Sequence, residues 1–165
     1  MSSSFCLSCQ DLITERLALR TWSTDEIVAV VGDGRAPRWA EDFPAEGDRV
    51  IAGVIAQQAG HEGAHRLIVE RASHLVVGSI SLLWPPTSGA VEVGFGVVPS
   101  RRGRNYAAEA ARALVEFALT SPEVQTVYAD VALSNPGSVR TLEKAGLRRR
   151  TSGATTARYD TTPRT

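Results

Sequence analysis

The chain of 165 residues has little cysteine, methionine or lysine and no excess of either charge. Its two cysteines, Cys6 and Cys9, form one C-x-x-C pair, whereas a structural zinc site takes about four ligands. His61, His65 and His74 lack zinc-ligand spacing, so we expect no metal. With 18 basic against 18 acidic residues, no overall field would draw the chain to nucleic acid or to an anionic membrane.

Long apolar runs are also missing. None approaches the roughly 20 residues that cross a bilayer. The polar start Met1-Ser2-Ser3-Ser4 lacks the basic and apolar regions of a signal peptide. These features predict a cytoplasmic protein with no membrane partner. What the chain does have is 43% hydrophobic residues, enough for the core of one compact domain.

The sequence pattern divides the chain into three parts. We expect a flexible tail over residues 1–11, a folded domain over 12–150, and a Thr-rich segment over 151–165 that supplies at most a last edge strand. A short or missing last strand would leave a sheet edge open to pairing with a second copy. A homodimer is therefore a candidate assembly.

The periodicity of apolar residues predicts strands mixed with helices. Strands are expected at 12–22, 66–71, 75–84, 91–98 and 125–133, with a short one from Leu147. Pro85-Pro86 should end the strand that begins at Leu75. Helices are expected after Ser23 as far as Gly32, from Asp48 to Gly60, from Asn105 over about four turns, and from Gly137 to Ala145. This order predicts a mixed α/β (α+β) domain.

The most informative stretch runs from Phe95 to Ala107, where a strand leads through a Gly/Arg turn into the longest helix. The first N–H groups of a helix have no intrahelical partner and lie at its positive end, so they suit a pyrophosphate. Gly103 permits close approach of the backbone, and Asn105 tolerates positive φ. The alternative is an arginine-rich surface turn that begins an amphipathic helix.

Residues 102–107, Arg-Gly-Arg-Asn-Tyr-Ala, resemble the acetyl-CoA signature R/Q-x-x-G-x-G/A of the Gcn5-related N-acetyltransferases (GNAT). Asn105 stands where that family has its middle glycine. The preceding Phe95-x-Val97-x-Pro99 and the following Glu109-Ala110 also fit the family. The strand before the turn and the helix after it are the context that such a signature requires.

A second segment begins at Asn135 and reads N-P-G-S-V-R-T-L-E-K-A-G-L. It resembles the N-x-x-S-x-x-x-L-E-K-x-G-F pattern of GNAT relatives of the ribosomal-protein alanine N-acetyltransferases, with Leu147 in place of the aromatic. The opening from Thr14, T-E-R-L-A-L-R, resembles the same subgroup. Asn135 ends a strand, and its amide can both cap the next helix and reach a ligand. A capped helix without a ligand is the alternative.

The resemblance covers residues 12–150 and implies a mixed, twisted, largely antiparallel sheet whose central strands splay apart, flanked by helices. It implies acetyl-CoA as the acetyl donor, and direct transfer to a primary amine in a ternary complex. The implied contacts with acetyl-CoA come from Phe95, Val97, Arg102, Gly103, Arg104, Asn105, Tyr106, Ala107 and Asn135.

The resemblance also implies catalytic roles. A backbone N–H at Val97 would polarise the thioester carbonyl. Glu92, earlier on the same strand, is the candidate base, although it could equally be the polar face of an alternating strand. Many members carry a tyrosine acid in the last helix, where this chain has Leu142. Ser138 shares a helix face with Leu142 and is a candidate donor to the leaving thiolate, with water as the alternative.

The acceptor amine is expected near residues 35–48, where Trp39 and Phe43 are candidate substrate contacts, with Trp84 as a second rim. The alternative for Trp39 and Phe43 is a place in the core. The acceptor is either a protein N-terminus or a small-molecule amine. Two other classes stay open: a non-catalytic acyl-CoA-binding regulator, and a protein-interaction domain in which the phosphate-like turn is accidental.

Overall fold

The computed structural model describes residues 8–32, 34–57 and 61–162. Its strands are β1 Leu12–Ile13, β2 Leu17–Thr21, β3 His65–Glu70, β4 Leu75–Thr87, β5 Ala90–Val97, β6 Thr126–Ala132, β7 Arg148–Ser152 and β8 Thr156–Asp160. Its α-helices are α1 Thr24–Val31, α2 Glu46–Gln57, α3 Tyr106–Leu119 and α4 Pro136–Lys144. Within the described residues the strands form one sheet in the order β1-β2-β3-β4-β5-β6-β8-β7. Only β5 and β6 pair in parallel.

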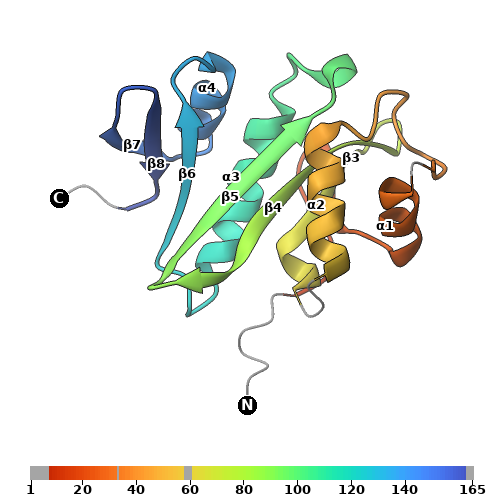
Figure 1. Ribbon diagram of the computed structural model, residues 1–165, viewed down its shortest axis with the longest axis horizontal. Helices are drawn as coiled ribbons and strands as arrows, with labels where there is room; N and C mark the ends of the chain where they lie inside the picture. Colours follow the sequence, from red (N-terminus) through yellow and green to blue (C-terminus); the bar gives the residue numbers. More distant parts are fainter. Residues whose placement is uncertain (1–7, 33, 58–60, 163–165) are drawn as a thin grey trace.

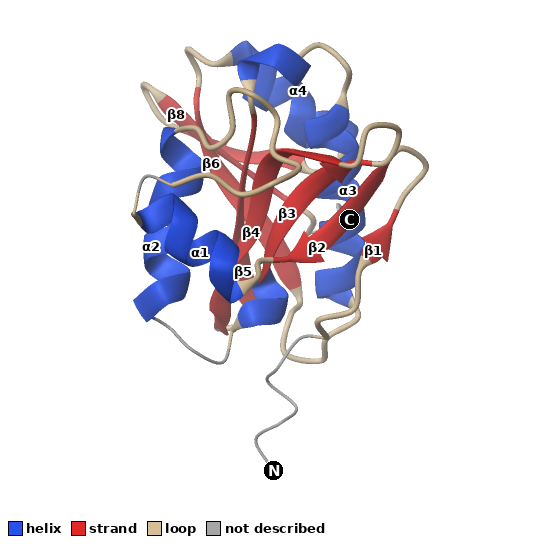
Figure 2. Ribbon diagram, turned by 90° about the vertical axis from the view of Figure 1, so that its right-hand side faces the viewer, coloured by secondary structure: helices blue, strands red, loops and turns tan. Residues whose placement is uncertain are grey.

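Helices cover both faces of this sheet. In Figure 1, α2 lies in front of the sheet and α3 behind it. The turned view in Figure 2 shows α1 and α2 together on one face, with α3 on the other. The sheet is thus the middle layer of three, and the fold is the expected mixed, largely antiparallel one.

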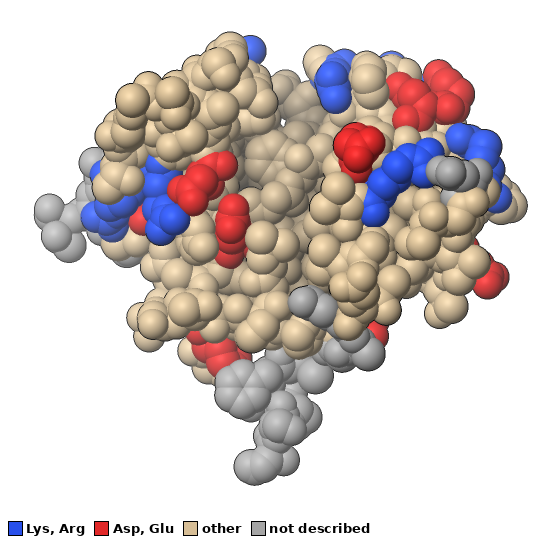
Figure 3. Space-filling view, in the orientation of Figure 1, with Lys and Arg blue, Asp and Glu red and all other residues tan. Residues whose placement is uncertain are grey.

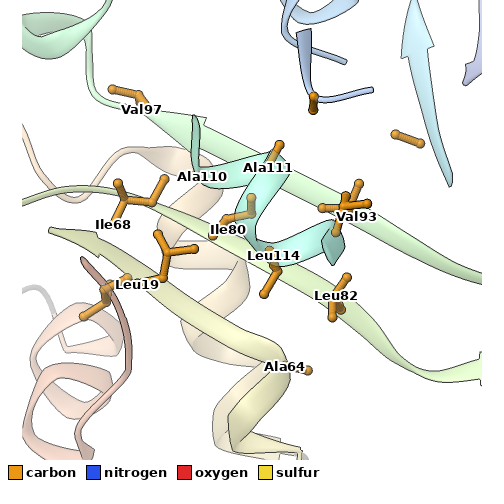
Figure 4. Close-up of a cluster of buried hydrophobic side chains, with 14 of the residues drawn as sticks. Leu19, Ala64, Ile68, Ile80, Leu82, Val93, Val97, Ala110, Ala111 and Leu114 are labelled. Atoms are coloured by element: carbon orange, nitrogen blue, oxygen red, sulfur yellow. The ribbon is translucent and has the colours of Figure 1, made fainter. Parts of the chain in front are cut away.

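The main core lies between the sheet and α3. Figure 4 shows Ile80 of β4 and Val93 of β5 beside Ala111 and Leu114 of α3, and all four are 2% exposed or less. Small residues such as Ala110 on the same helix face bring its backbone close to the sheet. The apolar stripe predicted from Asn105 onward is therefore the buried face of α3.

The start of α1 follows the expected capping chemistry. The Ser23 hydroxyl accepts a hydrogen bond from the Glu26 N–H at 3.1 Å, and the Glu26 carboxylate accepts one from the Ser23 N–H at 3.0 Å. Arg20 of β2 adds two hydrogen bonds to the same carboxylate. The helix is thereby fixed to the strand that precedes it.

Two predictions of strand boundaries need correction. The first predicted strand is two, because Leu12 turns back to pair with Leu19. The strand from Leu75 does not end before Pro85-Pro86 but continues to Thr87, and its pairing with β5 shifts register there. Proline cannot donate to a ladder, so it is tolerated where the ladder is interrupted.

The C-terminal segment forms more of the sheet than expected. Both β7 and β8 are present, and β8 lies between β6 and β7 instead of at the edge. The edge strand is therefore β7, whose residues are all exposed. The last strand, expected to be short or missing, is present as β8.

Part of the expected N-terminal tail is fixed to the domain through Arg66, a fully buried side chain of β3. The Arg66 guanidinium donates to the backbone carbonyls of Ser8 and Gln10, each at 2.6 Å, and to that of Leu19 at 3.1 Å. It also lies over the Phe117 ring of α3. Residues 1–7 of the predicted tail lie outside the described residues.

Gly78 of β4 allows the close approach of β5, and its replacement tests this contact. A Cβ there would collide with the Gly96 carbonyl oxygen and lie 3.0 Å from the Val97 Cα. We expect Gly78→Ala to lower the free energy of unfolding in urea by at least about 2 kcal/mol. Gly94→Ala is the matched control, because a Cβ on Gly94 of β5 meets nothing within 4 Å. Equal stability of the two variants would contradict this account.

Candidate functional site

The site begins where β5 and β6 part. Their parallel pairing runs only from Ala90 opposite Thr126 to Glu92 opposite Tyr128. Beyond that point β5 stays with β4 and β6 stays with β8, and Figure 1 shows the two strands diverging toward α4. A cavity of about 480 Å³ lies at this opening. The expected splay of the central strands is therefore present.

The cavity is lined from three directions, by the end of β5, the turn into α3, and α4. Its lining residues are Phe95, Gly96, Val97, Arg101, Arg102, Gly103, Asn105, Tyr106, Ala107, Asn135, Gly137, Ser138, Arg140, Thr141 and Lys144. All predicted contacts with acetyl-CoA except Arg104 are in this set, and so is Ser138. Segments far apart in the sequence thus form one site.

The turn into α3 depends on two residues with positive φ. Gly103 has φ 83° and Asn105 has φ 62°. This left-handed region costs most other residues about 1–2 kcal/mol, but asparagine tolerates it. The Asn105 Oδ1 accepts a hydrogen bond of 2.7 Å from Lys144 Nζ at the end of α4. The residue that replaces the middle glycine of the signature therefore also joins the two helices at the cavity.

The cavity carries positive charge only. Arg101, Arg102, Arg140 and Lys144 line it, and the lining includes no carboxylate. The Arg102 Nε donates to the Val97 carbonyl at 2.9 Å, which holds that side chain against the end of β5. The chain as a whole has no net charge, so this concentration of cations is a local feature whose charge favours an anionic ligand.

Strand geometry places the N–H of Val97 toward the opening. The N–H of the next residue, Val98, donates to the Val77 carbonyl on β4 at 2.9 Å. Successive N–H groups on a strand point to opposite sides, so the Val97 N–H points away from β4, where β6 has diverged. The Val97 carbonyl on the same side receives Arg102. This backbone can therefore hydrogen-bond a ligand that enters between the strands.

Arg104, a predicted acetyl-CoA contact, is not among the residues that line the cavity. Its guanidinium lies 3.1 Å from the carboxylate of Glu70, at the end of β3. Glu70 is 5% exposed and also accepts from the Tyr106 hydroxyl at 2.7 Å and from Ser73. Burial alone would raise the pKa of Glu70, but these hydrogen bonds and the neighbouring guanidinium groups lower it. A charged Glu70 thus joins the end of β3 to Arg104 and Tyr106 of the turn into α3.

Helix α4 supplies residues that the sequence reasoning missed. Asn135 caps it as expected, because its Oδ1 accepts from the Ser138 N–H at 3.2 Å. Leu142 is buried and is not among the lining residues. Gly137, Arg140, Thr141 and Lys144 do line the cavity, at the i, i+3, i+4 and i+7 spacing of one helix face. That periodicity, counted from the Asn135 cap, was the signal that could have identified them.

Glu92 lies on the opposite face of β5 from the α3 core, because its neighbours Val91 and Val93 are buried there. Across the sheet it stands beside Leu83 of β4 and Tyr128 of β6. Burial and the nearby Asp130 carboxylate raise its pKa, while Arg158 acts in the opposite direction. Glu92 is half-buried at the last paired position before the strands part.

An ion pair borders this region on β6 and β8. Arg158 donates two hydrogen bonds to Asp130, at 2.8 and 2.9 Å, and lies 4.2 Å from the centre of the Tyr128 ring. Figure 3 shows a hollow on this face of the molecule, with acidic side chains on both sides of it. The added Cβ atom at Gly94 would meet nothing within 4 Å, so the backbone of β5 is accessible there.

The three aromatic residues predicted to contact the acceptor are in the core. Trp39 is 5% exposed, Phe43 1% and Trp84 7%. Trp39 and Phe43 pack edge to face with ring centroids 5.1 Å apart, and Trp39 pairs with Val76 of β4. Trp39 and Phe43 therefore occupy the core, which was the alternative to acceptor contact. On this face the accessible aromatic side chain beside Glu92 is Tyr128, which the predictions did not include.

No helix in residues 8–32, 34–57 and 61–162 is long and apolar enough to cross a bilayer. In the same part of the chain no three His, Cys, Asp or Glu side chains gather as a metal site would require.

An open mixed sheet whose central strands part, with a cation-lined cavity beside the glycine turn at the start of a helix, has the architecture of the GNAT acetyltransferase domain. The chain belongs to this family, because the family model described as "Acetyltransferase (GNAT) domain" matches residues 16–148. The uncharacterized N-acetyltransferase YjdG of Bacillus subtilis (strain 168) is 36% identical over 81 residues, 48% of each protein. The chain thus spans about half the length of this curated relative.

Solved structures share the whole fold. An acetyltransferase of the GNAT family from Bacillus anthracis superposes with a TM-score of 0.67 over 92% of this chain and 97% of that one, at 18% identity. RimL, a ribosomal L7/L12 alpha-N-protein acetyltransferase in complex with coenzyme A, gives 0.65 over 92% and 97%, at 15% identity. At these identities the likeness establishes the fold.

The support that Glu70 gives the turn should depend on pH. Its pKa is lowered in the folded state, so its contribution is present above the ordinary value of about 4.3 and is lost as pH falls through the folded value. We expect the free energy of unfolding of Glu70→Gln to be about 2 kcal/mol lower than that of the wild type at neutral pH. Between about pH 5 and about pH 3 it should decrease less than the wild-type value does.

Urea unfolding at a series of pH values measures this difference. Glu143→Gln, which changes an exposed glutamate on α4, is the matched control and should follow the wild-type curve. A Glu70→Gln curve parallel to that of the wild type throughout the acid range would show that this carboxylate carries no such role.

Proposed function

We propose that this protein transfers the acetyl group of acetyl-CoA to a primary amine by direct attack in a ternary complex. The observation that supports the proposal is the cavity lined by cationic side chains. It lies where β5 and β6 part, beside the N-terminus of α3. Coenzyme A combines three phosphoryl groups with a long neutral arm. A basic cavity continuous with an open strand edge fits both parts.

The residues present fit such a ligand by their donor set. The phosphates would be held by Arg101 and Arg102, by backbone N–H groups of the turn at Gly103, and by Arg140 and Lys144 of α4. Val97 and Phe95 would lie along the neutral arm, with strand-edge N–H and carbonyl groups to pair with its amides. Bound there, acetyl-CoA supplies an activated thioester and needs no covalent enzyme intermediate.

The chain's own groups would then act on the acceptor. Glu92 would take a proton from the amine, directly or through one water, as the nitrogen forms its bond to the acetyl carbon and the carbon–sulfur bond breaks. The Val97 N–H would stabilise the negative charge that develops on the carbonyl oxygen. The coenzyme leaves as a thiolate, whose sulfur would accept a hydrogen bond from the Ser138 hydroxyl and take its proton from water.

The acceptor would approach over the face that carries Glu92 and Gly94, opposite to α3. Glu92 and Asp130 favour a cationic group there, while Tyr128 and Leu83 offer apolar surface. Both a protein N-terminus and a small-molecule amine have these properties. We propose no role in acceptor binding for Trp39, Phe43 or Trp84, because they are buried.

Calorimetric titration with acetyl-CoA tests the cavity. We expect micromolar binding to the wild type and a loss of more than about 100-fold in Gly103→Trp, which would fill the phosphate turn. Gly103→Ala is the matched control, because it adds the same backbone strain at φ 83° with only a methyl group. Its affinity should stay within about tenfold of the wild type. No binding to the wild type would remove the basis of the proposed function.

The role of Glu92 is tested by kinetics with an amine found in an acceptor screen. Glu92→Gln should lower kcat by about 10²–10⁴-fold at unchanged acetyl-CoA affinity. The charged form is the base, so the raised pKa of Glu92 sets the acid limb of the pH profile. We expect Asp130→Asn to move this limb to lower pH and Arg158→Gln to move it to higher pH.

Two outcomes would count against this mechanism. If Glu92→Gln turns over at the wild-type rate with a wild-type pH profile, another group is the base. If the wild type binds acetyl-CoA but acetylates no amine on a broad panel, the chain is instead a non-catalytic acyl-CoA-binding regulator. The buried Leu142, where many family members have a tyrosine acid, is the feature that would favour this second function.

A further inference from the structure

The loop between α1 and α2 is fixed against the sheet, although it lies outside the cavity. Arg35 donates to the carbonyls of Phe43 and Ala40, at 2.9 and 3.0 Å, and lies over the Trp39 ring. Trp39 is itself buried. The middle of this loop is therefore held both by hydrogen bonds and by the core.

This loop continues the sheet where β5 leaves it. Val98, just past the end of β5, donates its N–H to Val77 of β4. The adjacent Val76 on β4 accepts from the Ala40 N–H at 2.9 Å, and its own N–H donates to the Arg38 carbonyl at 2.8 Å. The loop and the start of the turn into α3 are thus neighbours along the same edge of β4.

Asp42 connects these neighbours. Its two carboxylate oxygens accept from the Ser100 N–H at 2.8 Å and from the Ser100 hydroxyl at 2.7 Å. Ser100 is in the 3₁₀ turn Pro99–Arg101, which opens the segment that carries Arg101 and Arg102 into the cavity. Although slight burial opposes it, these hydrogen bonds lower the pKa of Asp42, so it is charged at neutral pH.

We propose that Asp42 is a positioning residue for the cofactor turn: it fixes Ser100 so that Arg101 and Arg102 are already in place for the phosphates of coenzyme A. Asp42 is not among the residues that line the cavity. Its contribution is to restrict the turn before the ligand arrives, which lowers the ordering cost of binding. The proposal rests on the proposed function, since it assumes that the cavity takes coenzyme A.

Charge and positioning predict opposite effects for Asp42, which makes the inference testable. As a negative charge near the phosphates, Asp42 would weaken binding, so its neutralisation would tighten it. As an anchor for Ser100, it strengthens binding, so its neutralisation would loosen it. The sign of the change in affinity therefore distinguishes the two roles.

The experiment is calorimetric titration of the full chain with coenzyme A. We expect Asp42→Asn to raise the Kd about tenfold and Ser100→Ala to raise it about threefold, in line with the strength of hydrogen bonds to charged groups. The double variant should lose less affinity than the sum of the two single losses, because both changes remove the hydrogen bond between the Ser100 hydroxyl and the Asp42 carboxylate. Glu41→Gln, an exposed acid next to Asp42, is the control and should bind as the wild type does.

Thermal unfolding without ligand accompanies each titration. If Asp42→Asn folds less stably, Ser100→Ala and its double-variant coupling still report the contact, because Ser100 lies on the surface. Wild-type affinity or tighter binding in Asp42→Asn would overturn the positioning role, and so would fully additive effects. No binding of coenzyme A by the wild type would overturn the proposed function itself, and the positioning role with it.

Discussion

The arrangement of this molecule depends on the end of the hydrogen-bonded ladder between β5 and β6 at Glu92 and Tyr128. On one side of that point the sheet is continuous, and α3 packs across it to form the core. On the other side β5 and β6 no longer pair, and the turn that follows β5 leads into α3 beside the cavity. Glu92 therefore lies at the end of the ladder, and Val97 lies on the same strand at the cavity.

The residues that line the cavity include four cations and no carboxylate. Two of these cations are held by hydrogen bonds at the edge of the cavity. Arg102 donates to the Val97 carbonyl, and Lys144 donates to the Asn105 side chain. Glu70 lies outside the lining, 3.5 Å from the Arg101 guanidinium, and Asp130 pairs with Arg158 on β8. A chain with no net charge thus has a local excess of positive charge at the cavity.

Much of the fold and of the cavity followed from local sequence. The positive φ of Gly103 and Asn105, the cap at Ser23 and the apolar face of α3 all depend on residues within a few positions of each other. What the sequence did not reveal depends on distant partners. Arg104 could not be assigned to Glu70, nor β8 to a place between β6 and β7, because such pairings are decided by topology. The burial of Trp39 likewise follows from its pairing with β4.

The buried guanidinium of Arg66 has a consequence for how the chain can be shortened. Among the residues described, its hydrogen-bond acceptors are backbone carbonyls, and two of them belong to Ser8 and Gln10. A protein trimmed to begin at the first strand would lose these two acceptors. The Arg66 guanidinium beside Phe117 would then have N–H donors without a protein acceptor, which is costly for a buried cation. Ser8 and Gln10 thus belong to the packing around this buried cation, although they precede the first strand.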